Sequence, residues 1–215
     1  MTDRPFKHRT ERGAARLASL TRTAAEMFLD QGYEAVSLET LIEQVGGSRR
    51  NIYQHFGGKQ GLFVEVVSRL CEEQAQPLRI LDIEGSDIGE ALTTFGRKVL
   101  EIVLQPRTLA LHRLMIAEGQ RFPALAQAVL HSGHEAGVAL LSDWLRNRPE
   151  ILRANLPADT LAEQFVALLT TGPQLRALVG HEPMPLAPGT ITRMVQDAVS
   201  TFLHGALSAE TDKDA

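Results

Sequence analysis

The sequence has very little cysteine and no long apolar run. Its single cysteine, Cys71, has no second cysteine with which to form an intrachain disulfide. Charged residues, glycine or proline interrupt every hydrophobic run before it reaches the length that spans a bilayer, and the opening residues lack the apolar core of a secretory signal. We therefore expect a cytoplasmic protein in a reducing compartment, without a membrane partner. The 215 residues supply enough material for a packed core that needs no metal or disulfide.

Strand signals, internal repeats and low-complexity tracts are also missing. No stretch alternates apolar and polar residues for long, whereas an apolar periodicity of 3.6 residues recurs along the chain. The pattern predicts an all-α fold of about nine helices. The expected helices span roughly 11–31, 37–46, 48–56, 59–77, 86–105, 107–120, 122–148, 159–179 and 189–208.

The chain also has no overall excess of positive charge, since its net charge is −4. This charge argues against a protein that coats nucleic acid without regard to base sequence. The charge is nevertheless uneven. The first 60 residues hold nine Lys and Arg against seven Asp and Glu, and the rest hold thirteen against nineteen. Much of the early excess comes from a basic N-terminal arm that precedes the apolar face of the first helix. Its cations are Arg4, Lys7, Arg9, Arg12 and Arg16.

Catalytic motifs are missing as well: the chain has no nucleophile elbow, phosphate-binding glycine loop or zinc-protease motif. We therefore expect no enzyme, cofactor or metal. The alternative is a helical-bundle metalloenzyme that uses His112, His131 and His134, with Glu135 beside them, because histidines three residues apart share a helix face. The Glu-x-x-His pairs typical of di-iron bundles are not evident, and "HSGHEAG" is more typical of a polar surface turn.

Two short helices joined by a double glycine form the most informative pattern. Ser37 is placed to cap the first helix, which ends at Gly46-Gly47. Ser48 is placed to cap the second, which ends near Phe56. Two helices with a tight glycine turn and a short second member predict a helix-turn-helix, whose second helix enters the major groove of DNA.

The second helix separates polar from apolar side chains. Ile52 and Phe56 are expected to face inward, while arginine and amide groups that can read base edges face outward, with phosphate-binding groups around them. A simple helical hairpin with a solvated charged face is the alternative interpretation of the same pattern. The predicted DNA-binding residues are Ser37, Thr40, Ser48, Arg49, Arg50, Asn51, Tyr53, His55 and Lys59.

The segment "AAEMFLDQGYEAVSLETLIEQVGGSRRNIYQHFGGKQGLF" resembles the DNA-binding domain of the TetR/AcrR family of transcriptional regulators. The shared pattern is an apolar first helix ending in Gly-Tyr, a Ser cap, a glycine turn, and Tyr-x-x-Phe followed by Lys. The resemblance implies that Tyr53, His55 and Lys59 contact phosphates and that residues 48–51 lie near bases. Three features depart from the family: Ile42 replaces a common Ala, Gly47 replaces a common Val, and Arg50-Asn51 replaces the commoner Gly-Thr.

The stretch "RLMIAEGQRFPALAQAVL" more loosely resembles the C-terminal region of the AefR-like TetR subgroup. The resemblance implies that this region binds a small molecule and that the last two helices form a homodimer, across which the two reading helices are spaced. The candidate ligand-binding residues are Phe95, Val99, Leu114, Met115, Trp144, Phe165 and Leu169. The candidate dimer-interface residues are Phe165, Leu168, Pro173, Ile191, Met194, Val195, Ala198, Val199 and Phe202.

These patterns together predict three parts. Residues 1–58 form a three-helix DNA-binding domain with its basic arm, residues 59–210 form a larger helical bundle for ligand binding and dimerisation, and residues 211–215 form a disordered tail. The functional hypothesis is a repressor that binds a palindromic operator in double-stranded DNA as a homodimer. A small-molecule effector would release it, or would act as a corepressor if it bound the DNA-competent state more tightly.

Overall fold

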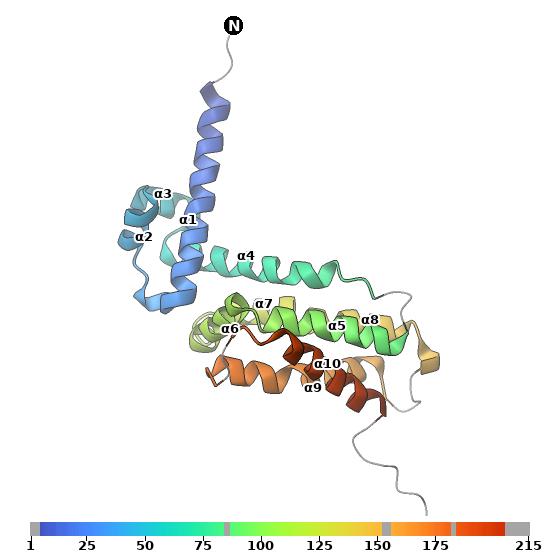
Figure 1. Cartoon of the computed structure of the whole chain (residues 1–215). Coiled ribbons are helices and arrows are strands. Elements are labelled where there is room, and N and C mark those ends of the chain that lie inside the picture. Colours follow the sequence, from blue (N-terminus) through green and yellow to red (C-terminus); the bar gives the residue numbers. More distant parts are fainter. Residues whose placement is uncertain (1–4, 84–86, 152–155, 182–183, 205–215) are drawn as a thin grey trace, which may run out of the picture. The chain divides into compact units, whose positions relative to one another are not determined.

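The computed structural model describes residues 5–83, 87–151, 156–181 and 184–204, and the regular structure in these ranges is entirely helical (Figure 1). The elements are α1 (Pro5–Ala35), α2 (Leu38–Val45), α3 (Arg49–Phe56), α4 (Lys59–Arg79), α5 (Ile88–Val103), α6 (Pro106–Glu118), α7 (Pro123–Leu130), η1 (His131–Glu135), α8 (Ala136–Arg146), η2 (Pro149–Ile151), α9 (Ala158–Leu178) and α10 (Pro188–His204). The π-helical η1 joins α7 to α8, so these form one continuous helical stretch. The predicted all-α fold of about nine helices is confirmed.

Some predicted features fall outside the described ranges. Arg4 of the basic arm, the predicted helix start at Ser86 and the tail 211–215 lie there. Asp87 caps α5 instead, because its carboxylate accepts a hydrogen bond from the Glu90 amide at 2.9 Å. Within the described part of the chain, no helix combines the length and apolar character needed to cross a membrane.

The first helix is longer than the sequence indicated. The predicted start near residue 11 is wrong, since α1 begins at Pro5. The predicted stop at Gly32 is confirmed, because Gly32 breaks the helical backbone with φ 80° and ψ 174°. A short helical segment, 33–35, follows this kink, so that α1 extends to Ala35.

The chain divides into two compact units. The first, called the N-terminal unit, contains residues 1–74 and 110–132, and the second, called the C-terminal unit, contains residues 75–109 and 133–215. The second half of α6 and all of α7 therefore belong to the same compact unit as the helix-turn-helix. The boundary between residues 58 and 59, which the sequence analysis placed between a DNA-binding part and a ligand-binding part, divides the chain by function. It stays a prediction.

Aromatic side chains form the centre of the N-terminal unit. The Phe63 ring centroid lies 5.0 Å from that of Phe28, 4.8 Å from that of Tyr33 and 4.9 Å from that of Phe122. All four side chains are buried. Phe63 meets Phe28 and Tyr33 in the edge-to-face geometry that aromatic rings favour, and Tyr33 meets Phe122 in the same way. This cluster joins α1 and α4 to the start of α7, which explains why the 110–132 segment packs with the first helices.

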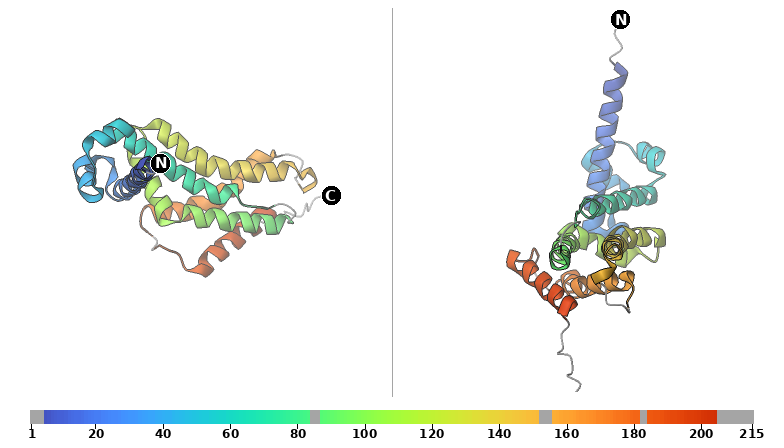
Figure 2. Two further views of the ribbon diagram at one scale, coloured as in Figure 1. Left: turned by 90° about the horizontal axis from the view of Figure 1, so that it is seen from above. Right: turned by 90° about the vertical axis from the view of Figure 1, so that its right-hand side faces the viewer.

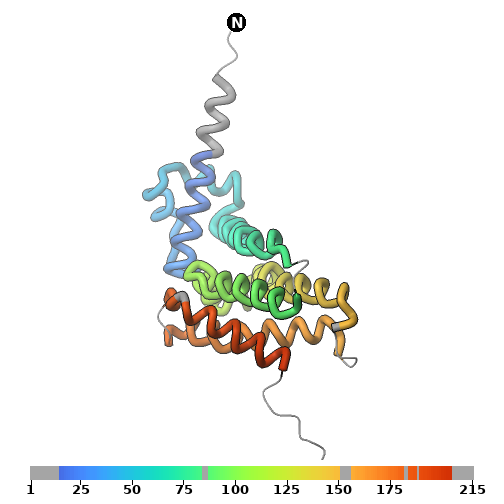
Figure 3. The backbone as a smooth tube through the Cα atoms, turned by 45° about the vertical axis from the view of Figure 1, so that its right-hand side comes forward, coloured from blue at the N-terminus to red at the C-terminus, as the bar shows by residue number. Residues whose placement is uncertain are grey.

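Four helices form the bundle of the C-terminal unit, in which α8 packs along α9 and α10 packs along α5 (Figures 2 and 3). Their apolar stripes meet in one core that includes Leu92, Phe95, Phe165 and Val195. Gly96 lies in this core, where a Cβ would come 3.3 Å from the Val195 side chain. The close approach of α10 to α5 thus depends on a small residue.

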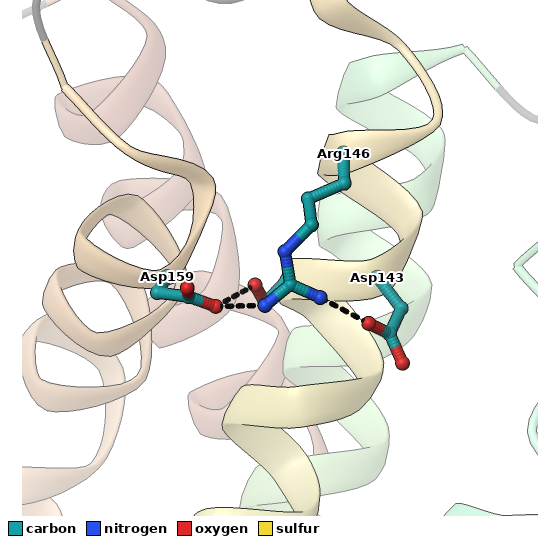
Figure 4. Close-up of polar contacts among 4 residues, drawn as sticks. Asp143, Arg146 and Asp159 are labelled. Atoms are coloured by element: carbon teal, nitrogen blue, oxygen red, sulfur yellow. Dashed lines mark hydrogen bonds and ion pairs between the residues drawn. The ribbon is translucent and has the colours of Figure 1, made fainter.

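Polar contacts fasten α8 to the first turn of α9. The Arg146 guanidinium forms ion pairs with Asp143 and Asp159, and Figure 4 shows it between the two carboxylates. The buried Ser142 hydroxyl also donates a hydrogen bond to Asp159. The Ser142 hydrogen bond first, and then Arg146, lower the pKa of the Asp159 carboxyl, so this carboxylate stays charged at neutral pH.

Acid is expected to destabilise the fold through His112 on α6. Burial lowers the pKa of its imidazole below the ordinary 6.5, so the unfolded chain binds more protons than the folded chain as the pH falls through 6.5. The free energy of unfolding should therefore drop between pH 7.5 and pH 5.5, with a contribution from this group of at most about 1.4 kcal/mol per pH unit. Urea unfolding at both pH values, with His112→Gln, measures the effect. The variant should show a smaller drop, whereas the exposed His131→Gln should match the wild type, and equal drops in all three would contradict the assignment.

Candidate nucleic-acid interface

Serine caps start both helices of the helix-turn-helix, as the sequence predicted. The Thr40 backbone N–H donates to Ser37 Oγ at 3.0 Å, and the Asn51 backbone N–H donates to Ser48 Oγ at 3.3 Å. A hydrogen bond of 2.8 Å also joins the Ser37 and Thr40 hydroxyls. Because the caps satisfy free amides and the first turns carry a positive potential, both helices begin where a phosphate can be accommodated.

The turn between α2 and α3 requires both of its glycines. Gly46 has φ 68° and donates its N–H to the Ile42 carbonyl at 2.8 Å, and Gly47 has φ 129°. A β-branched residue is strained at such angles, so the valine that the family commonly has at the second position would not fit this backbone. Gly47 is therefore the residue that this particular turn needs.

The two faces of α3 differ as predicted. Ile52 is 1% exposed and Phe56 is partly buried against the same core, while Arg49, Arg50, Asn51, Tyr53 and His55 are all exposed. Figure 1 shows α3 beside α2 and α1 in the N-terminal unit. The helix thus docks through one side and presents two cations, an amide, a phenol and an imidazole on the other.

Arg49 is not free on that face, because Glu39 on α2 holds it. Arg49 Nη1 donates to Glu39 Oε1 at 2.7 Å, and the Arg49 Cζ atom lies 5.8 Å from the centroid of the Tyr53 ring. Both partners of the ion pair are mostly exposed, so the pair is worth about 0–1 kcal/mol and water or a phosphate can compete with it. Arg50 is exposed on the same face.

Lys59 lies at the start of α4 on the ring of Tyr33. Its Nζ is 4.4 Å from the ring centroid and donates to the Glu34 backbone carbonyl at 3.1 Å. Burial lowers the pKa of the Lys59 ammonium, and the Glu118 carboxylate acts in the opposite direction. An ammonium has three donors, so this hydrogen bond leaves others available for a phosphate.

The predicted ligand residues do not form one group. Phe95, Val99, Trp144, Phe165 and Leu169 are buried together in the core of the C-terminal unit. The remaining two candidates, Leu114 and Met115, are buried in the core of the N-terminal unit. The Trp144 indole N–H donates to the Ile83 carbonyl at 2.8 Å, so the partner that a buried indole needs is internal. The assignment of a ligand to these side chains stays a prediction.

The predicted interface residues divide by burial. Leu168 is exposed, and Ile191, Met194 and Phe202 are partly buried. The others, Phe165, Pro173, Val195, Ala198 and Val199, are buried within the protomer itself, where they support the surface from beneath. The sequence analysis did not select Leu175 of α9 or Val179 at its C-cap, which are also exposed.

The three histidines of the metalloenzyme alternative do not gather. His134 pairs with Glu163 of α9, with 2.9 Å between Nε2 and Oε1, whereas His112 and His131 belong to the other compact unit. Among the residues that the structure describes, no three His, Cys, Asp or Glu side chains are close enough to hold a metal ion. The metalloenzyme alternative has no support.

Sequence reasoning missed the partners of the predicted DNA-binding cations. Glu39 holds Arg49 from the preceding helix. Glu34 and Tyr33 contact Lys59, and Arg121 contacts the same two residues. No periodicity links a residue of the α6–α7 turn to α1, since the contact depends on how separate helices pack. The stretch "EGQRFP" belongs to the segment that loosely resembles the AefR-like subgroup, and that resemblance indicates no contact with α1.

Comparison with known proteins agrees with this geometry. Residues 20–66 match the family described as bacterial regulatory proteins, tetR family. Residues 90–205, more than half of the chain, match the AefR-like transcriptional repressor C-terminal domain. Both assignments coincide with the two resemblances drawn from the sequence, which are confirmed.

Individual relatives extend the match to most of the chain. The HTH-type transcriptional repressor BdcR of Escherichia coli (strain K12) is 24% identical over 183 residues, which cover 84% of this chain and 87% of that protein. A structure described as a TetR-family transcriptional regulator from Mesorhizobium loti aligns with a TM-score of 0.74 at 23% identity, covering 89% of this chain and 96% of that one. The flavonoid-responsive regulator FrrA aligns with a TM-score of 0.72 at 26% identity, covering 88% and 96%. The chain therefore belongs to the TetR family of transcriptional regulators, with an AefR-like C-terminal domain.

Proposed function

We propose that this TetR-family regulator is a cytoplasmic repressor that binds a palindromic operator as a homodimer and is released by a small-molecule effector. It acts on DNA by binding rather than by catalysis. The observation that carries the proposal is the exposed polar face of α3, opposite the buried Ile52. Arg50 and Asn51 on this face read base edges, while Tyr53, His55 and Lys59 bind phosphates.

The caps and the turn support the same docking. Ser37, Thr40 and Ser48 place hydroxyls at the starts of α2 and α3, where phosphate is favoured. Arg49 exchanges the weak ion pair with Glu39 for a guanine edge or a phosphate when DNA approaches. The Glu39 carboxylate then faces a base, and its chemistry suits the amino group of cytosine.

A dimer is proposed because one recognition helix covers only a few base pairs. Leu168 and Leu175 of α9 and Val179, its C-cap residue, are 48%, 59% and 70% exposed, and their separations of seven and four residues place them on one side of the helix. Together with the partly buried Ile191 and Met194 of α10, they offer the apolar surface for a contact between two copies. A twofold axis through this contact places two recognition helices on successive major grooves, about 34–36 Å apart or a multiple of it.

The effector is proposed to act within the C-terminal unit, whose core holds Phe95, Trp144 and Phe165. The name of FrrA describes a flavonoid-responsive regulator, which supports a small organic effector for this chain too. Release requires the effector to bind the DNA-incompetent state more tightly. A coupling of about 1–3 kcal/mol changes operator affinity by roughly 5–150-fold.

Selection of genomic fragments by the purified chain, followed by footprinting, is expected to yield a short palindrome. Its half-sites should be about 10 base pairs apart or a multiple of this, because two recognition helices on one face of the duplex repeat once per helical turn. A mixture of fragments without a shared sequence would reject the repressor proposal.

A matched pair of variants tests whether α3 does the reading. Asn51→Ala should relax the base preference at one position in each half-site, because it removes an amide that reads a base edge. Tyr53→Phe should weaken binding to all sequences alike, because it removes only a hydroxyl that contacts phosphate. If both variants select the wild-type palindrome with unchanged affinity, another element reads the DNA.

A further inference from the structure

Arg121, in the turn between α6 and α7, lies on the same aromatic ring as Lys59. Its Cζ atom is 4.6 Å from the centroid of Tyr33, and Lys59 Nζ is 4.4 Å from the same centroid. Tyr33 is buried, and Phe122 packs against it with ring centroids 5.0 Å apart. Two cations from distant parts of the sequence thus share one ring inside the N-terminal unit.

Glu34 contacts both cations with different groups. Its backbone carbonyl accepts the hydrogen bond from Lys59 Nζ at 3.1 Å, and its carboxylate forms an ion pair with Arg121 Nη1. The carboxylate that Arg121 binds therefore belongs to the residue whose carbonyl already binds Lys59. Glu34 thus contacts the two cations that share the Tyr33 ring.

The choice of side chain at position 121 suits this arrangement. A planar guanidinium can stack on a ring and donate to a carboxylate at the same time, which an ammonium does less well. Arg121 is also half exposed, so it is not required to fill the core. The Glu118 carboxylate raises the pKa of Lys59, but its effect is smaller than that of burial, which lowers the pKa of that lysine.

We propose that Arg121 is a positioning residue for DNA binding, which occupies the Glu34 carboxylate so that Lys59 keeps its ammonium available for a phosphate. This inference rests on the proposed function, in which Lys59 binds the DNA backbone. It assigns a role in DNA binding to the α6–α7 turn, more than 60 residues beyond the helix-turn-helix. In Arg121→Ala the freed carboxylate captures Lys59, and each protomer loses one phosphate contact.

Operator binding measured across a salt series tests the inference. Arg121→Ala should weaken binding by about tenfold or more at 0.1 M salt and reduce the salt slope by about 0.9 per protomer, as the loss of one phosphate contact does. Adding Glu34→Gln to Arg121→Ala should restore both the affinity and the slope, because residue 34 then has no carboxylate that can capture Lys59, while Glu118 is the same in all variants. Arg121→Lys should lie between the wild type and Arg121→Ala, because an ammonium still pairs with the Glu34 carboxylate but stacks on the ring less well.

The acetylation rate of Lys59, measured by mass spectrometry on the free protein, gives a readout that needs no DNA. Pairing with a carboxylate raises the pKa of an amine, so Lys59 should react more slowly in Arg121→Ala and recover in the double variant, with Lys98 as the internal reference. If Arg121→Ala weakens binding but Glu34→Gln restores neither readout, Arg121 acts through packing alone and the inference is overturned. If the wild type selects no operator, the proposed function fails, while the acetylation result still decides whether Arg121 controls Lys59.

Discussion

Replacing Gly61 with alanine is expected to destabilise the protein by about 3 kcal/mol, at the upper end of what overpacking costs. A Cβ built on Gly61 would lie well inside van der Waals contact with the Phe56 carbonyl oxygen and 2.8 Å from its carbonyl carbon. Both obstructing atoms are backbone, so no side chain can rotate away and the last turn of α3 must move. Chemical denaturation measures the change, and operator affinity should fall with it, because α3 presents the reading groups.

Gly189→Ala is the matched control for this effect. Gly189 lies in the first turn of α10, and a Cβ there would meet nothing within 4 Å. The control should change stability by less than about 1 kcal/mol and toward greater stability, because alanine favours helix and restricts the unfolded chain. If Gly61→Ala unfolds at the wild-type denaturant concentration, the junction between α3 and α4 is less tightly fixed than the structure indicates.

The helix-turn-helix could be predicted from sequence because its determinants are local. Ser37 and Ser48 cap helices that begin within one residue of them, and the Gly46-Gly47 pair sets the turn. Ile52 and Phe56 face inward because the spacing along one short helix decides it. Each of these features depends on residues only a few positions apart, which is the range in which sequence patterns are informative.

Features that depend on packing between distant segments could not be predicted. Nothing in the sequence around Arg121 indicates that it lies on Tyr33, and nothing around Leu114 indicates that its core partners are in α1 and α4. The apolar stripe of α10 could likewise not be assigned from the sequence. Val195 and Val199 are buried in the core of the protomer, although the same pattern fits a dimer interface equally well.

The double substitution Leu175→Glu and Val179→Glu is expected to convert the proposed dimer into monomers. Both side chains are exposed on the same face of α9, so the isolated protomer tolerates the charges. In a twofold contact the change places four carboxylates near one axis, where desolvation and mutual repulsion oppose association. Light scattering coupled to size exclusion measures the mass. Operator affinity should fall by about 100-fold or more, because the second half-site no longer binds as part of the same molecule.

Ile80→Glu provides the comparison, since Ile80 is an apolar side chain that is 78% exposed and lies outside α9 and α10. A charge there should leave both the mass and the affinity unchanged, which separates the α9 surface from a general effect of added negative charge. A double variant that remains dimeric would place the contact on another surface. A double variant that is monomeric yet binds the operator with wild-type affinity would mean that each protomer recognises DNA independently, and the spacing of paired recognition helices would then have no part in regulation.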